Sequence, residues 1–285
     1  MNVIEVEDVC FSYRKGEKQV VRNLDFNVAP GEIYGFLGPS GAGKSTTQRI
    51  LIGLVRGWSG TVKVLGFDPG EAKPDFYRDI GVSFELPNLH PKLTGKENLE
   101  FFQAFYNTTR EPDELLEMTD LKEFSGMKVE SYSKGMKMRL NFCRALLHNP
   151  KLLFLDEPTS GLDPVYAQRV KEIIKEERDA GKTIFLTTHN MFVADELCDR
   201  VALMVDGKLA AEDTPAALKS DEGSGTVQVK WRGEDRNGEE SFNLKDIGRN
   251  SRFLRLLRDR EIISISTPQP TLEDTFIRIT GRSLA

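Results

Sequence analysis

Nine consecutive residues, from Gly38 to Thr46, carry the clearest chemical signal in the sequence. They read Gly-Pro-Ser-Gly-Ala-Gly-Lys-Ser-Thr, after the short apolar run 33–37 and before a helix-like stretch that starts at Gln48. A glycine loop between a strand and a helix lets backbone N–H groups turn inward around phosphates. We expect Lys44 to reach the β- and γ-phosphates of a nucleotide and Ser45 to offer its hydroxyl to Mg²⁺. The residues expected to bind nucleotide here are Gly38, Pro39, Ser40, Gly41, Ala42, Gly43, Lys44, Ser45 and Thr46.

Two adjacent carboxylates follow a second apolar run, residues 152–155. Asp156, at the tip of the expected strand, can contact hydrated Mg²⁺. Glu157, which we expect on the other side of the strand, can polarise a water that attacks a γ-phosphate. An acidic turn without chemistry is the plain alternative, and the phosphate loop earlier in the chain favours the chemical interpretation.

Three more residues have a structural explanation beside a chemical one. Ser133 precedes a helical pattern and is a good N-cap, and a helix start also attracts anions. Asp163 stands at a second helix start of this kind, with proline as the next residue. His189 follows the β-branched run 183–188, so we expect it at a strand end, where an imidazole can bond a γ-phosphate and orient a water.

The elements that must position these residues alternate between short apolar runs and helical patterns. This alternation predicts an α/β core with a largely parallel sheet. Strands are expected over 3–13, 18–28, 32–37, 60–65, 80–84, 152–156, 183–188 and 201–205. Between residues 86 and 150 helical patterns take over, at 97–106, 113–118 and 134–148, which indicates a helical insertion.

The last part of the chain indicates a small α+β appendage. Residues 220–225 have the composition of a linker. Beyond them the sequence predicts a strand, a helix, a strand and a last helix, at 226–231, 253–258, 262–265 and 272–279. Leu272, Phe276 and Ile279 would form the packing stripe of the last helix. We therefore divide the chain into a domain of residues 1–217 and an appendage of residues 218–285.

Composition and charge narrow the class of protein. The 285 residues are 39% hydrophobic and 29% charged, which is globular composition. A net charge of −5 argues against a general nucleic-acid surface, and we expect no nucleic-acid partner. No apolar run approaches the roughly 18 residues of a membrane-spanning helix, and the first residues lack a signal-peptide pattern. Three widely spaced cysteines indicate neither a disulfide framework nor a zinc site.

Taken in order, these motifs resemble the nucleotide-binding subunits of ABC transporters over about residues 1–215. Tyr-Ser-Lys-Gly-Met at 132–136 stands where that family has its Leu-Ser-Gly-Gly-Gln signature. Ser-Gly-Leu-Asp at 160–163 matches the loop after the family's catalytic glutamate. The resemblance implies an α/β P-loop NTPase core of the ABC ATPase type, with an antiparallel β subdomain, a helical subdomain at about 86–150 and the small α+β C-terminal appendage.

The resemblance also implies roles for single residues. Glu157 would be the general base and His189 the switch histidine, with Lys44 as the third catalytic residue. An aromatic residue near the N-terminus would stack on adenine, and the signature would complete the phosphate cage of an ATP held by a second subunit. The residues outside the loop that would bind nucleotide are Tyr13, Ser133, Gly135 and Asp163.

Two departures from the family pattern affect the metal and the signature. Glu85 stands where the family usually has glutamine, so the expected Mg²⁺ contacts are Ser45, Glu85 and Asp156, with added negative charge near ATP. Lys134 replaces a glycine of the signature, and Met136 replaces its glutamine. Lys134 would bring a cation towards the phosphates of the second subunit and offset Glu85.

For the whole chain the resemblance implies an ATPase that dimerises around two MgATP. It would drive export of a small molecule, either drug-like, an antibiotic or an ion, through separate polytopic membrane subunits. We take the second ATPase subunit as identical and the protein as peripheral at the cytoplasmic face of the cell membrane. The tail, residues 270–281, is similar to the tails of type-two drug, antibiotic and sodium exporters. The membrane subunit is expected to dock near 85–99, where Leu86, Leu89 and Leu93 line either the groove or the core of the insertion.

Two other classes are weighed against this interpretation. Soluble ABC ATPases that act on ribosomes, DNA or cluster assembly usually carry two such domains, long coiled coils or zinc insertions, none of which appears in this sequence. A P-loop kinase or GTPase would lack the motif at 132–136 and would not need His189. The guanine-specific Asn-Lys-x-Asp motif is also absent.

Overall fold

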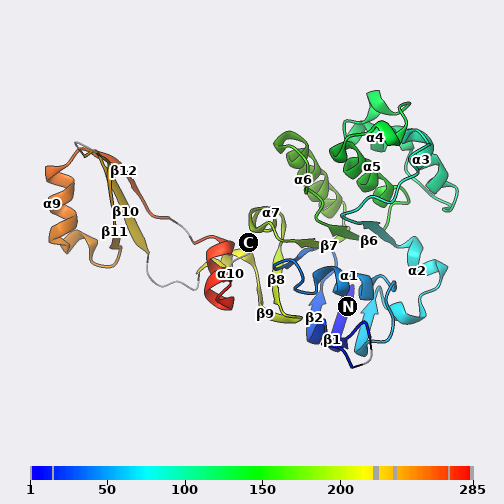
Figure 1. Ribbon diagram of the computed structural model, residues 1–285, viewed down its shortest axis with the longest axis horizontal. Helices are drawn as coiled ribbons and strands as arrows, with labels where there is room; N and C mark the ends of the chain where they lie inside the picture. Colours follow the sequence, from blue (N-terminus) through cyan, green and yellow to red (C-terminus); the bar gives the residue numbers. More distant parts are fainter. Residues whose placement is uncertain (1, 15, 221–224, 234–235, 269, 283–285) are drawn as a thin grey trace.

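The computed structural model describes residues 2–14, 16–220, 225–233, 236–268 and 270–282 (Figure 1). At its centre is a six-stranded sheet in the order β5-β6-β7-β3-β8-β9, parallel except for β9, which runs antiparallel to β8. Its strands are β3 (Ile33–Leu37), β5 (Ile80–Ser83), β6 (Leu152–Asp156), β7 (Thr183–Thr188), β8 (Arg200–Val205) and β9 (Lys208–Asp213). Every residue of β3, β6 and β7 is buried, as apolar and β-branched runs predict for strands covered on both faces.

A second sheet, antiparallel and three-stranded, packs against one face of the first. It contains β1 (Ile4–Phe11), β2 (Val21–Val28) and β4 (Ser59–Val64), in the order β2-β1-β4. Aromatic rings pack between the sheets: the ring of Phe26 in β2 is stacked 5.6 Å from that of Tyr34 and lies tilted 5.3 Å from that of Phe36, centroid to centroid. This arrangement confirms the expected antiparallel β subdomain.

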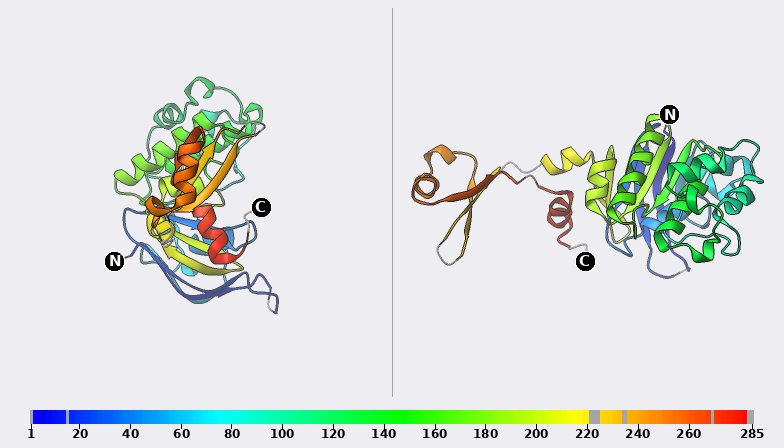
Figure 2. Two further views of the ribbon diagram at one scale, coloured as in Figure 1. Left: turned by 90° about the vertical axis from the view of Figure 1, so that its left-hand side faces the viewer. Right: turned by 90° about the horizontal axis from the view of Figure 1, so that it is seen from above.

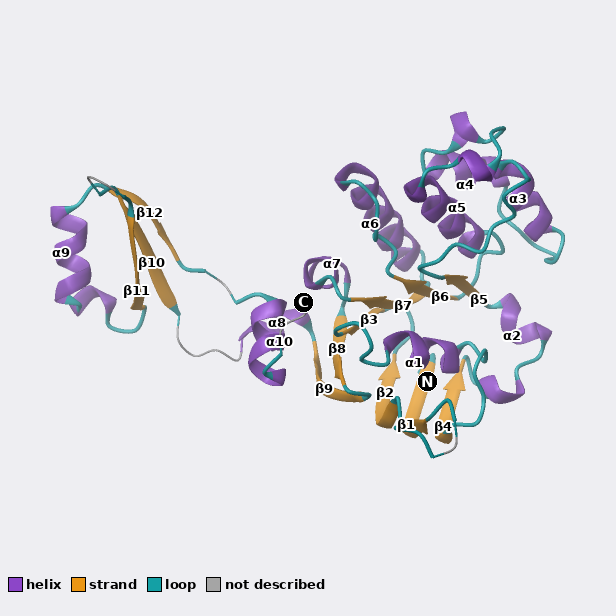
Figure 3. Cartoon of the chain, in the orientation of Figure 1, coloured by secondary structure: helices purple, strands orange, loops and turns teal. Residues whose placement is uncertain are grey.

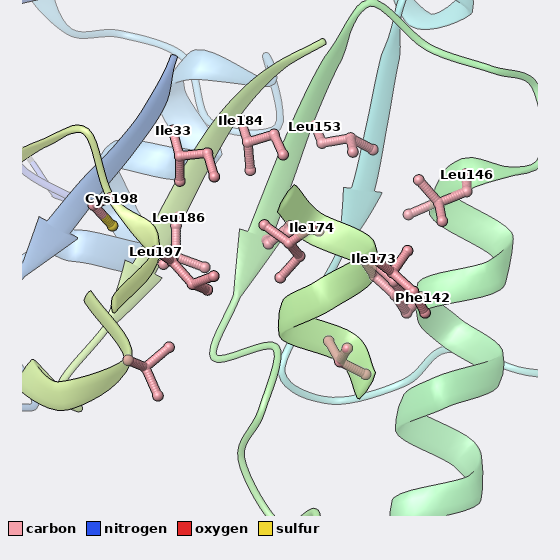
Figure 4. Packing of buried hydrophobic residues seen from close by; sticks show 14 of the residues in the cluster. Ile33, Phe142, Leu146, Leu153, Ile173, Ile174, Ile184, Leu186, Leu197 and Cys198 are labelled. Atoms are coloured by element: carbon pink, nitrogen blue, oxygen red, sulfur yellow. The ribbon is translucent and has the colours of Figure 1, made fainter. Parts of the chain in front are cut away.

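Helices cover the other face of the central sheet (Figure 3). They are α6 (Pro164–Asp179), α7 (Met191–Leu197) and the helical region of α3 (Gly95–Gln103), α4 (Pro112–Met118) and α5 (Lys134–Leu146). Figure 4 shows Phe142 and Leu146 of α5 packed towards Ile173 and Ile174 of α6. The helices α3, α4 and α5 confirm the helical insertion expected between residues 86 and 150.

Shorter helical segments complete the core. They are α1 (Lys44–Leu51), α2 (Pro74–Arg78) and α8 (Pro215–Ser220), with single 3₁₀ turns at Pro69–Glu71, Lys122–Phe124, Val129–Ser131 and Ile247–Arg249. In the part of the chain that is described, no helix has the length and apolar character needed to cross a membrane. Cys10, Cys143 and Cys198 are free thiols.

The C-terminal segment divides between two places in the fold. A three-stranded sheet of β10 (Thr226–Trp231), β11 (Gly238–Asn243) and β12 (Ile262–Ser266) carries α9 (Ser251–Asp259) and encloses a small core of its own. We call this unit the C-terminal lobe. The last helix, α10 (Leu272–Thr280), returns to lie beside α8 and α7, away from the lobe (Figure 2).

The structure differs from the sequence prediction in several elements. Ile279 does not belong to the packing stripe of α10, because it is exposed and Thr275 is buried with Leu272 and Phe276. The strands β9 and β11 are not predicted from the sequence. Both lie at the edge of a sheet and are largely exposed, so their residues show no clear alternation of apolar and polar types. The short helices α2, α7 and α8 were also missed. Of the predicted linker, residues 221–224 lie outside the described residues.

Candidate active site

The phosphate loop joins β3 to α1 and is shaped by its glycines. The helix α1 begins at Lys44, four residues earlier than predicted, so Lys44, Ser45 and Thr46 occupy its first turn. Gly43 has φ of 113°, and a β-carbon there would lie 2.9 Å from the backbone carbonyl oxygen of Val20, so the position favours glycine. Lys44 Nζ donates to the carbonyl oxygens of Gly38 (2.6 Å) and Pro39 (3.1 Å), which folds its side chain back over the loop.

The loop forms one wall of a cavity of about 260 Å³. The opposite walls come from the ends of β6 and β7 and from the segment after β5, because the carboxyl ends of parallel strands meet at one edge of a sheet. The residues that line it are Val20, Ser40, Gly41, Gly43, Lys44, Ser45, Thr46, Glu85, Asp156, Glu157 and His189. The structure thus brings together residues that are spread over most of the ATPase motifs in the sequence.

Asp156, the last residue of β6, and Glu157, the residue after it, both line this cavity. Asp156 accepts a hydrogen bond from Thr187 Oγ1. Glu157 has left the strand and has a left-handed backbone, with φ of 49°, so it does not point to the other side of the strand as predicted. Its Oε2 accepts from Thr188 Oγ1 (2.8 Å), and its Oε1 accepts from the backbone N–H of His189 (2.8 Å).

The imidazole of His189 completes the hold on Glu157. Its Nδ1 lies 2.6 Å from Glu157 Oε1. Because an ionised carboxylate only accepts, Nδ1 carries the proton in this contact, and Nε2 is on the opposite edge of the ring. The His189 side chain is 56% exposed while that of Glu157 is 10% exposed, so the histidine is the solvent-facing member of the pair.

The electrostatics of the cavity reflect burial of several charges together. Burial lowers the pKa of the Lys44 ammonium, and the carboxylates of Glu157, Asp156 and Glu85 oppose that effect. Burial likewise raises the pKa of Asp156, against the hydrogen bond from Thr187. Three carboxylates therefore face one lysine in this cavity, an arrangement that favours an additional cation.

The oxygen donors in the cavity fit Mg²⁺ bound with phosphates. Within the described residues, no three or more His, Cys, Asp or Glu side chains are arranged to hold a metal ion by themselves. Mg²⁺ commonly takes only one or two carboxylates from a protein and completes its shell with waters and substrate phosphates. The hydroxyl of Ser45 and the carboxylates of Asp156 and Glu85 are donors of that kind.

Seven predicted nucleotide contacts lie outside the cavity lining: Gly38, Pro39 and Ala42 of the loop itself, and Tyr13, Ser133, Gly135 and Asp163. Tyr13 is half-exposed, and its hydroxyl is 3.0 Å from Thr46 Oγ1, which places it at the edge of the loop. Ser133 is the N-cap of α5, with Oγ accepting from Met136 N, and Asp163 is the N-cap of α6. Both N-cap predictions are confirmed. Gly135 lies beside the loop that precedes Asp163 in the same chain.

Two threonines of the site were missed by the sequence interpretation. Thr187 and Thr188 hold Asp156 and Glu157 in place through their hydroxyls. The signal for them was present, because a strand of β-branched residues that ends in two threonines beside a functional histidine offers two hydroxyls at the sheet edge.

Comparisons with known proteins agree with this geometry. A family model described as ABC transporter matches residues 21–160. A fluoroquinolones export ATP-binding protein of Mycobacterium tuberculosis is 48% identical over 99% of this chain and 94% of its own length. The Nod factor export ATP-binding protein I of Rhizobium etli is 37% identical over 100% of this chain and 95% of its own length.

Solved structures add the fold and a nucleotide state. The ATP-binding subunit of an ABC transporter superposes with a TM-score of 0.70 at 28% identity, covering 76% of this chain and 92% of that one. A dimeric ATP-binding cassette in a post-hydrolysis state with ADP and Pi superposes with a TM-score of 0.66 at 27% identity, covering 74% and 98%. The chain therefore belongs to the ABC transporter family, as one of its ATP-hydrolysing subunits.

Proposed function

We propose that two copies of this chain close around two MgATP and that Glu157 acts as the general base of hydrolysis. The observation that carries the proposal is the position of Glu157. Its carboxylate shares a cavity with the phosphate loop and is oriented by three donors, from Thr188 and His189. A base held in this way beside a γ-phosphate can take the proton of an attacking water.

His189 would change partner when ATP is bound. In the structure its Nδ1–H is committed to Glu157, so a bond from Nε2 to a γ-phosphate oxygen requires the doubly protonated imidazolium or a switch of tautomer. A γ-phosphate that attracts His189 would release Glu157 Oε1 for the attacking water. Lys44 would turn from its carbonyl partners to the β- and γ-phosphates. Mg²⁺, when bound through Ser45, Asp156 and Glu85, would neutralise phosphate charge.

The second copy would supply what the cavity lacks. Ser133 and Gly135 are in the first turn of α5 or at its cap, outside the cavity of their own chain, with Asp163 nearby at the start of α6. A helix N-terminus is an anion site, so a head-to-tail partner can present these residues to the bound phosphates. Tyr13, at the loop edge, would turn onto adenine.

Export of a small molecule is the transport reaction that the relatives support. Both relatives named above are export ATP-binding proteins, and each aligns with this chain over nearly its whole length. This full-length similarity favours a transporter over a soluble ABC ATPase acting on ribosomes, DNA or cluster assembly. The substrate would be drug-like, an antibiotic or an ion. The protein would sit peripherally at the cytoplasmic face of the cell membrane, on polytopic membrane subunits.

A groove between the core and the helical region would receive the membrane subunit. It has a volume of about 230 Å³ and aromatic walls that include Phe84, Phe102 and Tyr106. Leu86, two residues after Phe84 in the sequence, is 80% exposed and fits a docking contact, whereas Leu89 packs against the buried core. We also propose the domain division at residue 217, with α10 as the part of the appendage that packs back on the ATPase domain.

Affinity purification tests the transport proposal. Glu157→Gln, which should slow hydrolysis and hold the closed state, would be purified with MgATP from detergent-solubilised membranes. We expect a stoichiometric polytopic membrane protein to accompany it. Glu123→Gln, the same change at an exposed residue of the helical region, is the control and should retain less of the partner. Recovery of ribosomes or DNA, or of no partner, would contradict the proposal.

A further inference from the structure

The edge strand β5 is covered by a row of polar side chains from α5. The strand is the last in the central sheet, so its outward carbonyls lack a neighbouring strand. Asn141 Nδ2 donates to Phe84 O (2.9 Å), Arg144 Nη2 donates to Val82 O (3.3 Å), and His148 Nε2 lies 2.8 Å from Ile80 O. The carbonyl oxygens of Ile80 and Val82 in β5, and that of Phe84 just after the strand, thus each accept a hydrogen bond. The donors lie on one face of α5 and on His148, two residues after its end.

The backbones of β5 and α5 also lie in close contact. A β-carbon at Gly81 would lie 2.1 Å from the carbonyl oxygen of Ala145, so glycine alone permits this contact. Together with the donors, this contact fixes α5 along the whole length of β5. Glu85, two residues after the end of β5, lies in the phosphate cavity. Ser133, the N-cap of α5, is where the second subunit's ATP is expected.

Asn141 is the member of this row nearest to Glu85. Its amide is fully buried and donates twice, to Ser83 Oγ (3.0 Å) and to Phe84 O (2.9 Å), the two residues immediately before Glu85. Its Oδ1 has no partner among the described residues. A buried amide oxygen without a partner costs desolvation free energy, so the two bonds donated by the amide nitrogen are what this residue contributes.

We propose that Asn141 is a positioning residue that holds Glu85 at the phosphate cavity and fixes it to the helix that carries Ser133. The inference rests on the proposed function, because Glu85 is a metal contact only within that proposal. Loss of the Asn141 amide would leave Phe84 O without its donor and allow Glu85 to move away from Asp156 and the phosphate loop. Mg²⁺ dependence is therefore the property that should report on Asn141.

Asn141→Leu, which keeps the shape and removes both donors, is the test variant. We expect the Mg²⁺ concentration for half-maximal ATPase activity to rise by about threefold or more, the scale of one lost hydrogen bond. In a Glu85→Gln background the same change should give no further shift. His148→Leu is the matched control: it removes a donor at the opposite end of β5, and should lower the melting temperature without moving the Mg²⁺ titration.

A second readout does not depend on activity. Amide hydrogen exchange of residues 83–88, without nucleotide, should be faster in Asn141→Leu than in His148→Leu. Ser83→Ala removes one of the two bonds from the strand side and should act in the same direction if Asn141→Leu does not fold. An unchanged Mg²⁺ titration with only a lower melting temperature, or an equal shift in the Glu85→Gln background, would overturn the proposal.

The two proposals fail in different ways. If Glu85→Gln alone leaves the Mg²⁺ titration unchanged, the metal contact assigned to Glu85 is wrong. The exchange comparison then decides the role of Asn141 by itself, and equal exchange of residues 83–88 in Asn141→Leu and His148→Leu would refute it.

Discussion

The ATPase core and the C-terminal lobe are each covered by a nine-residue helix from the C-terminal segment, α10 on the core and α9 on the lobe. In α10, Leu272, Thr275 and Phe276 are buried against the core, and Thr275 Oγ1 bonds Leu218 O. In α9, Phe253 is the buried residue, over a small core of Val227, Val229 and Phe242. The appendage therefore contains one helix, α10, that buries its side chains in the ATPase core and one, α9, that buries its phenylalanine in the lobe.

The contacts after α10 extend through one turn to the phosphate loop. Arg282, just after α10, forms a bidentate ion pair with Asp206 in the turn between β8 and β9. The next residue, Gly207, donates its backbone N–H to Ala42 O in the loop (2.9 Å). The segment after α10 therefore contacts the turn that is hydrogen-bonded to the phosphate loop. The lobe is separate and has its own core.

The largest difference should appear in catalysis. Glu157→Gln removes the proposed base and should lower ATPase activity by about 10²–10⁴-fold. Glu240→Gln makes the same change in the lobe, where the side chain pairs with Arg252, and should leave the rate within about twofold. Steady-state phosphate release measures both. Equal losses of activity in the two variants would show that the lobe takes part in the chemistry and would contradict its separation from the ATPase core.

Stability should separate the two helices next. Phe276 is fully buried in the main core, so Phe276→Ala should cost about 3–5 kcal/mol of unfolding free energy. Phe253→Ala opens a cavity only in the small lobe core and should leave the denaturation midpoint of the core unchanged. Denaturant unfolding followed by separate probes in core and lobe tests this. A single common transition lowered by either change would contradict the division.

The Mg²⁺ dependence of the ATPase rate tests the role of Glu85 in the core. Glu85→Gln removes one carboxylate from the phosphate cavity and should raise the Mg²⁺ concentration for half-maximal activity by about tenfold, the lower end of effects for residues around metal sites. The ATPase rate at saturating ATP, measured across a Mg²⁺ titration, gives the value. If the titration is unchanged, Glu85 makes no metal contact and Lys134 has no extra charge to offset.

The smallest effect should come from the exposed ion pair at the end of the chain. Hydrogen bonding to Arg282 lowers the pKa of Asp206, so the stabilisation is complete at neutral pH and is lost as the pH falls through the lowered value. Arg282→Ala should therefore lower the melting temperature slightly at pH 7 and low salt, and not at high salt. Thermal melts at pH 7 and at acid pH, each at two salt concentrations, measure this. A shift that persists in high salt or at acid pH would exclude a simple ion pair.

Much of the fold was predictable because strong local patterns determine it. The apolar runs of β3 and β6, the β-branched run of β7 and the glycine loop predicted a buried sheet with a phosphate site at its edge. The edge strands β9 and β11 were not predictable, since partial covering leaves no clear alternation of residue types. Ile279 was misplaced because helical spacing gives a stripe and not the extent of the surface that covers it.

The site was predictable in its motifs and not in its connections. Lys44, Asp156, Glu157 and His189 were found from residue type and order, and the cavity joins them. The hydroxyls that orient the carboxylates and the amide of Asn141 escaped prediction, because such contacts depend on which elements become neighbours. The backbone turn at Glu157 was also unforeseen, since a left-handed glutamate is set by tertiary structure rather than by local preference.

Light scattering with and without MgATP tests whether two copies of this chain share their nucleotide sites. In the Glu157→Gln background we predict a monomer without nucleotide and a dimer with MgATP. Adding Ser133→Asp should abolish that dimer, because aspartate still caps α5 but repels the partner's phosphates. Thr94→Asp, the same kind of change at the cap of α3, should leave it intact. An MgATP dimer that survives Ser133→Asp would contradict the account.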